Sequence, residues 1–274
     1  MKYYDLNLKG NSYETDKELI LEGHRLGWDY FNLLFSPEDY EIAIEYKDDL
    51  IAEVDDILKE NPRKIISIEF GIEIRAKNQN EVYKIPQKFR NKCKYISVLG
   101  GDLKINRAVC ENLRIDVLSR PYLNNRECGI NQVLAKEAYR NNVAIEIVFN
   151  DILSSYLSYR SKIMAHFREI IKLHKKFKFP LIVSSGSSSM WDIRSPKDIS
   201  AIFKSLDLSE EEIIRCLYDY PKNIVDFNNN RENMVVEGVK KIDKDINIGI
   251  NKIINKKVYK EVYEDTFKED KDET

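Results

Sequence analysis

The sequence predicts an α/β fold in which about seven parallel strands form a closed or nearly closed barrel with surrounding helices. Apolar, β-branched and aromatic runs recur seven times, and helical patterns separate most of them, as in repeated βαβ units. Several runs, such as residues 65–68 and 144–149, are largely apolar, as expected for strands that are covered on both faces. The length of 274 residues suits one such barrel, which commonly takes about 250 residues.

The expected elements alternate regularly along the chain. Runs rich in β-branched and aromatic residues predict strands; they cover residues 3–8, 30–35, 65–74, 95–99, 115–118, 143–149 and 181–183. Apolar residues at helical spacing predict helices; these cover residues 16–26, 37–60 in two pieces, 103–112, 130–141, 160–179, 196–206 and 209–219. The last helix opens with a capping box, in which the side chains of Ser209 and Glu212 each bond the other residue's backbone amide.

A change in composition near residue 230 predicts a domain boundary. The chain becomes rich in Asn at residues 228–233 and ends in a strongly charged stretch. We therefore assign residues 1–230 to the barrel and residues 231–274 to a charged C-terminal tail. Apolar residues such as Ile250 and Val258 recur in the tail, so part of it is expected to be helical and its end disordered. Both a solvated appendage and a dedicated binding element remain open for the tail.

Composition is that of a folded protein without a global basic charge. Hydrophobic residues make up 43% and charged residues 33%, which excludes disorder throughout. A net charge of -2 means that nucleic-acid binding needs a local basic patch or a protein partner. The four cysteines form no C-x-x-C pair, which argues for reduced thiols. The sequence offers no apolar signal region and no run of about eighteen apolar residues, so we expect a cytoplasmic protein without membrane contact.

The most informative stretch joins the fourth predicted strand to the next helix. It reads YISVLGGDLKINR, at residues 95–107. An apolar strand ends at Leu99, and the glycine pair frees the backbone to turn sharply. Lys104, Asn106 and Arg107 then project from the following helix. A strand can deliver polar side chains to a ligand in this way, although simple turn chemistry is the alternative.

Polar residues also follow two other predicted strands, at the end where a barrel carries its functional loops. Ser119 and Arg120 leave the fifth strand just before a proline, which favours extended geometry. Residues 184–194 hold five serines, one glycine, a tryptophan and Arg194. Small hydroxyl residues such as Ser185 beside a glycine can form a backbone nest for an anion such as phosphate. A flexible turn before a helix cap is the alternative.

The helix at residues 160–179 is the most basic segment. Residues 159–178 carry seven Lys or Arg against one Glu. Arg168 and Lys172 fall on a solvent face, where they could contact phosphates or simply be solvated. The three histidines lie in helical patterns without ligand-like spacing, so we assign no catalytic residue and no metal ligand.

Ordered motifs along residues 1–228 resemble those of one family, the archaeal and eukaryotic ribonuclease P protein component 3. The motifs are YYDLN at 3–7, VLGGDLKINR at 98–107, NLRIDVLSRP at 112–121, GINQVLA at 129–135, NVAIE at 142–146, PLIVSSG at 180–186 and MWDIRSP at 190–196. The tail after Asn228 lies outside the resemblance.

This resemblance implies a TIM-like barrel related to the PHP metallophosphoesterase superfamily. It also implies a protein subunit of the ribonuclease P (RNase P) ribonucleoprotein, the nuclease that removes 5′ leaders from precursor tRNA. In such a complex the RNA subunit carries the catalytic centre and its Mg²⁺, so the isolated chain is expected to be inactive and to bind no cofactor. The implied partners are RNase P RNA, a second small protein subunit and other RNase P proteins, with precursor tRNA as the substrate of the complex.

The first strand departs from the superfamily, because metal-binding PHP enzymes carry H-x-H where this chain has Asp5-Leu-Asn7. The leading hypothesis is therefore a subunit that is not catalytic alone and that contacts RNA or a partner. Its candidate contact residues are Lys104, Asn106, Arg107, Arg114, Arg120, Arg168, Lys172, Ser185 and Arg194. Internal ion pairing with Asp102, Glu111 and Asp116 is the alternative for several of them.

Two other functions stay open at this point. One is a stand-alone metal-dependent phosphoesterase with a divergent site around Asp5, Asn7, Glu69 and Asp102. The other is a partner-binding protein that contacts no RNA.

Overall fold

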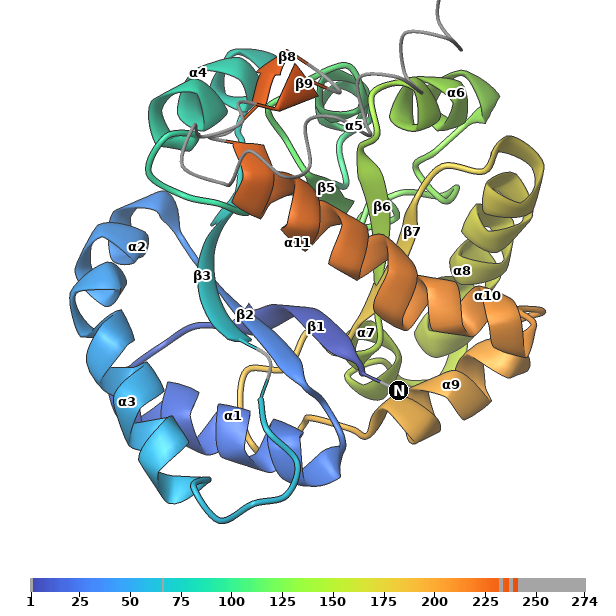
Figure 1. The fold of residues 1–274 in the computed structure, drawn as a ribbon. Helices are drawn as coiled ribbons and strands as arrows, with labels where there is room; N and C mark the ends of the chain where they lie inside the picture. The colour runs from blue at the N-terminus through green and yellow to red at the C-terminus, as the bar shows by residue number, and fades with distance from the viewer. Residues whose placement is uncertain (1, 66, 232–233, 237–238, 241–274) are drawn as a thin grey trace, which may run out of the picture. The chain divides into compact units, whose positions relative to one another are not determined.

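The computed structural model describes residues 2–65, 67–231, 234–236 and 239–240. The first seven strands form one parallel sheet in sequence order. They are β1 (Tyr4–Lys9), β2 (Tyr30–Phe35), β3 (Ser67–Ile74), β4 (Ile96–Leu99), β5 (Val117–Ser119), β6 (Ala144–Val148) and β7 (Leu181–Ser184). The sheet curls into a nearly closed barrel with helices around it, which confirms the predicted fold class (Figure 1).

Helices follow most strands and cover the outside of the barrel (Figure 1). They are α1 (Tyr13–Leu26), α2 (Pro37–Ala43), α3 (Lys47–Ile57), α4 (Gln79–Phe89), α5 (Leu103–Cys110), α6 (Gln132–Arg140), α7 (Asn150–Leu153), α8 (Leu157–Phe177), α9 (Pro196–Lys204), α10 (Glu210–Ile214) and α11 (Tyr220–Asn230). A 3₁₀ turn, η1 (Ile44–Tyr46), joins α2 to α3, and a π-helical turn, η2 (Arg215–Asp219), joins α10 to α11. Within the described chain, no helix is long and apolar enough to span a membrane.

Side-chain caps explain where several helices begin. Asn78, Asp102, Asn131 and Ser195 each accept a hydrogen bond from a backbone amide in the first turn of α4, α5, α6 and α9. The capping box predicted at Ser209 is confirmed, because both of its reciprocal bonds are present at the start of α10.

Two apolar layers stabilise the barrel. The larger one lies between the sheet and the outer helices and includes Phe31, Phe70 and Phe167. The smaller one fills the barrel at the amino ends of the strands, where Tyr4 stacks on Tyr30 with ring centroids 4.8 Å apart. Ile224 of α11 packs into this inner cluster, and α11 crosses the barrel opening in Figure 1. Helix α11 thus covers the amino-terminal end of the barrel.

The chain divides into two compact units, residues 1–229 and a second unit that begins at Asn230. In the second unit, β8 (Met234–Val236) and β9 (Val239–Lys240) form an antiparallel pair. The helix expected around residues 246–262 of the tail lies outside the described residues.

Candidate functional site

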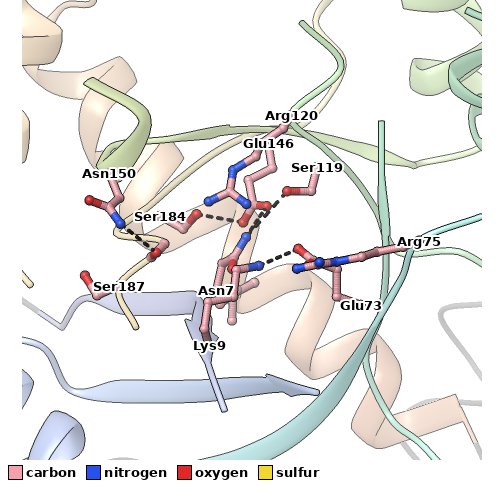
Figure 2. Close-up of polar contacts among 12 residues, drawn as sticks. Asn7, Lys9, Glu73, Arg75, Ser119, Arg120, Glu146, Asn150, Ser184 and Ser187 are labelled. Atoms are coloured by element: carbon pink, nitrogen blue, oxygen red, sulfur yellow. Dashed lines mark hydrogen bonds and ion pairs between the residues drawn. The ribbon is translucent and has the colours of Figure 1, made fainter. Parts of the chain in front are cut away.

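The carboxyl half of the barrel interior is lined by polar side chains from several strands (Figure 2). Glu146 on β6 is fully buried at its centre. Asn7 Nδ2 on β1 donates to Glu146 Oε2 at 2.7 Å, and Ser184 Oγ on β7 donates to Oε1 at 2.7 Å. Asn7 Nδ2 also lies 3.4 Å from Ser119 Oγ on β5. This network joins four strands, three of them through the Glu146 carboxyl group, and gives both of its buried oxygens a hydrogen-bond donor.

An ion pair occupies the barrel mouth beside this network. Lys9, the last residue of β1, pairs with Glu73 on β3, and Arg75 Nη2 lies 3.6 Å from the same carboxylate (Figure 2). Burial alone raises the pKa of Glu73, but the charges of Lys9, Arg120 and Arg75 outweigh it and hold the pKa below its ordinary value. Glu73 is therefore a paired anion and not a carboxyl group poised for proton transfer.

A second ion pair closes the other side of the mouth. Arg120 Nε lies 3.1 Å from Asp151 Oδ2, which also accepts a 2.5 Å hydrogen bond from Tyr122 Oη. Arg120 has a φ of 50°, so its backbone adopts the left-handed conformation that non-glycine residues rarely take. Gly186, with a φ of 68°, makes room for this arrangement, since a Cβ there would lie 3.1 Å from Arg120 Nη2 and 2.1 Å from Val148 Cγ1.

Asp5 joins β1 to the loop that follows β7. Its Oδ1 accepts hydrogen bonds of 3.2 Å from the backbone amides of Asn7 and Ser185. The backbone amide of Lys9 donates to Ser187 O at 2.8 Å and joins the same two segments. Burial raises the pKa of Asp5 to about 6. Its Oδ2 is buried, and no described residue forms a hydrogen bond with it.

These residues do not fit the metal site of a phosphoesterase. Asp5 and Asn7 line the interior, but Glu69 pairs with Lys47 at 2.6 Å and Lys94 at 3.8 Å. Asp102 caps α5. Among the residues that the structure describes, no group of three or more His, Cys, Asp or Glu could hold a metal ion. The mouth is filled with ion pairs instead, so the divergent phosphoesterase site is not assembled.

The Gly-Gly turn after β4 serves loop packing. A Cβ on Gly100 would lie 2.7 Å from Asn106 Oδ1 and 2.8 Å from Pro121 Cα, and Gly101 has a φ of 118°. Asn106 is fully buried; its Oδ1 accepts from Gly101 N at 3.0 Å, and its Nδ2 donates to Pro121 O and Gly129 O at 3.0 and 2.9 Å. Asn106 therefore ties the β4–α5 turn to the loop that follows β5.

Three of the nine predicted contact residues belong to this interior scaffold. Asn106 and Ser185 are buried, and Arg120 is 13% exposed in its ion pair with Asp151. Their polar groups hold the barrel-mouth loops together. Their predicted contacts with RNA or a partner stay predictions, because the spacing of residues does not separate scaffold from surface.

The other six candidates lie at or near the surface. They are Lys104, Arg107, Arg114, Arg168, Lys172 and Arg194. Arg107 pairs with Glu111 at 2.8 Å, the internal ion pair weighed as its alternative role. Arg194 is half-buried, and its Nη1 donates to Trp191 O and Ile193 O. Their contacts with RNA or protein stay predictions.

Sequence reasoning missed the central residues Lys9, Glu73 and Asp151, which form ion pairs, and Glu146, which accepts two hydrogen bonds. A usable signal was present for two of them. Glu73 and Glu146 stand in the apolar strands IEFGIEI and AIEIV, where a charge needs a partner. The identity of those partners depends on strand register, which the sequence alone does not give.

Comparisons with known proteins agree with this architecture. A family model for RNase P subunit p30 matches residues 2–233. Ribonuclease P protein component 3 of Methanothermobacter thermautotrophicus is 39% identical over 241 residues, covering 88% of this chain and 95% of that protein. The same component of Methanocaldococcus jannaschii is 33% identical, covering 84% and 94%.

Solved structures show the same barrel. A chain in a cryo-EM structure of archaeal ribonuclease P with mature tRNA is 29% identical, with a TM-score of 0.71, covering 89% of this chain and all of that one. A probable 2-pyrone-4,6-dicarboxylic acid hydrolase from Acinetobacter baumannii is only 12% identical, with a TM-score of 0.50 over 83% of this chain and all of that one, and shows the fold alone. From the family model and these relatives, the chain belongs to the RNase P subunit p30 family.

Proposed function

We propose that this chain is a protein subunit of the RNase P ribonucleoprotein, which removes 5′ leaders from precursor tRNA. The observation that carries the proposal is its similarity, over the full length of the matched chain, to a chain in archaeal ribonuclease P with mature tRNA. The family match over residues 2–233 supports the same role. The partners are then RNase P RNA, a second small protein subunit and other RNase P proteins.

In this role the chain supports catalysis by the RNA subunit and its Mg²⁺. The barrel mouth favours a supporting role, because Lys9, Glu73, Arg120 and Asp151 are committed to ion pairs. Glu146 accepts two hydrogen bonds inside the barrel, so it is not presented to a substrate. The scaffold of a hydrolase-like barrel is thus retained for assembly.

Reconstitution tests this function directly. Purified chain is combined with RNase P RNA and the other protein subunits, and precursor tRNA cleavage is measured with and without it. We expect omission of the chain to lower the cleavage rate or to raise the Mg²⁺ concentration required. Unchanged cleavage after omission, or hydrolysis of precursor tRNA by the chain alone with bound metal, would contradict the proposal.

A further test addresses the exposed basic residues. Replacing Lys104, Arg107 and Arg114 together by Ala should weaken assembly and flatten its salt dependence, since each lost phosphate contact reduces the salt slope by about one. A control replaces Lys59, an exposed lysine just after α3 that pairs with Asp56. If the wild type, the triple variant and the Lys59 variant show equal salt slopes, these three basic residues do not contact RNA phosphates.

A further inference from the structure

The start of α8 is exposed on every side. Residues 156–162 are all exposed, and Ile163 is the first buried residue of the helix. A helix on a barrel normally buries one face along its whole length. Here Tyr156 is 75% exposed, Tyr159 is 49% exposed and Leu157 is 90% exposed. The described chain provides no cover for these large side chains, which is typical of an interaction surface.

The charge around these rings has one sign. Residues 152–168 contain no Asp or Glu but include Arg160, Lys162 and Arg168, in a chain whose net charge is -2. Arg160 is held in place, because its Nε donates to Ser155 O at 2.8 Å and its guanidinium lies 6.0 Å from the centre of the Tyr156 ring. The surface therefore offers aromatic faces beside fixed positive charge.

A third exposed ring lies on the neighbouring loop. Trp191 is 80% exposed and follows β7, the strand paired with β6. Asn150, which opens α7 after β6, donates to Gly186 O and Asp192 Oδ2, both at 3.3 Å, and so joins the two loops. Figure 2 shows Asn150 beside Ser184 and Ser187.

Hydrogen bonds hold the loop that carries Trp191 in place. Asp192 accepts hydrogen bonds from the backbone amides of Ser188 and Ser189 as well as from Asn150, so its charge faces internal donors. On the other side, Trp28 Nε1 donates to Arg194 O at 2.9 Å. Trp191 is thus exposed on a loop whose conformation is fixed by internal hydrogen bonds.

We propose that Tyr156, Tyr159 and Trp191, with Arg160 and Lys162, form a surface that stacks unpaired bases of RNA. This inference rests on the proposed function and names the RNA-contacting face. Every base has a π face that stacks on aromatic rings, and the adjacent phosphates match Arg160 and Lys162. A protein partner would be expected to bury Leu157, the most exposed apolar side chain, and to present acidic groups.

The test compares the loss of aromatic rings with the loss of aliphatic area. Tyr156→Leu and Trp191→Leu remove the ring but leave an apolar side chain, whereas Leu157→Ala removes aliphatic area and keeps every ring. Tyr139→Leu on α6, where Tyr139 is 61% exposed, is the matched control for loss of an exposed tyrosine elsewhere. All four positions are at the surface, and thermal unfolding confirms that each variant is folded.

Each variant replaces the chain in the reconstituted complex, and two quantities are measured. The protein concentration for half-maximal activation of the RNA subunit reports contact with RNase P RNA; the Kd of the assembled complex for precursor tRNA reports contact with the substrate. We expect Tyr156→Leu with Trp191→Leu to weaken one of them on the order of tenfold. Leu157→Ala and Tyr139→Leu should change both less than about twofold.

The outcomes separate the possible failures. If both quantities are unchanged in the ring variants while the wild-type complex is active, the stacking surface is wrong and the subunit role stands. If Leu157→Ala is as harmful as the loss of the rings, the surface binds protein and the inference is overturned. If the wild-type chain itself gives no activation, the proposed function fails first.

Discussion

Asp5 is a buried carboxyl group whose protonation is coupled to folding. Its folded pKa of about 6 lies above its ordinary value because of burial. The folded state therefore holds this proton more tightly than the unfolded state. The resulting stabilisation is fully present below about pH 4 and is lost as the pH rises through about 6.

This coupling predicts the effect of Asp5→Asn. The amide keeps an oxygen for Ser185 N but carries no charge, so the variant should be more stable than wild type at about pH 7.5 by about 2 kcal/mol. The difference should shrink at about pH 4.5, where the wild-type carboxyl is protonated. Urea unfolding at the two pH values measures it; a constant difference would show that Asp5 does not titrate in this range.

Lys9 and Glu73 illustrate the cost of removing the main partner of a buried charge. Glu73 is only 5% exposed, so Lys9→Met should lower the free energy of unfolding by about 3 kcal/mol. The double variant Lys9→Met with Glu73→Leu should recover most of this loss, because no unpaired charge remains. A double-mutant cycle by chemical denaturation gives the coupling energy. Additive losses would mean that the two side chains act independently.

At the scale of elements, α5 is anchored by one buried amide. The three hydrogen bonds of Asn106 join the β4–α5 turn to the loop after β5. Asn106→Ala removes the side-chain partner of Gly101 N and of Gly129 O, while Pro121 O keeps its hydrogen bond from Asn125 Nδ2. The variant should lower the free energy of unfolding by about 3 kcal/mol. Arg107→Ala, at the exposed neighbour, should leave the free energy of unfolding nearly unchanged, because solvent screens its ion pair with Glu111. Similar losses for both, measured by thermal unfolding, would contradict the anchoring role.

Elements with strong apolar periodicity were predictable, and others were not. All seven strands and the basic helix α8 were expected from their patterns. The expectation missed α4, which contains Pro86 and buries only Val82, Pro86 and Phe89 among polar residues. It also missed α11, whose Pro221 suggests an end to the preceding helix. Both helices are stabilised by the surface that they cover more than by their own sequence.

At the scale of the whole molecule, we expect the stability of the barrel to depend on α11. A chain ending at Asn230 should keep its Tm within about 2 °C, because residues 1–229 form their own compact unit. A chain ending at Asp219 loses Ile224 from the inner cluster and should lose at least about 3 kcal/mol. Calorimetry of both truncations checks this. Equal stability would mean that α11 does not close the barrel.

The sequence by itself determined the barrel class, the order of strands and the family, because periodicity and ordered motifs are local properties of the chain. It also marked the loops after β4, β5 and β7. Only the tertiary structure decided that Asn106, Arg120 and Ser185 are internal. It also decided that Lys9 forms an ion pair with Glu73 and that the tyrosines at the start of α8 are exposed. Those facts depend on strand register and barrel curvature, which bring residues far apart in the chain into contact.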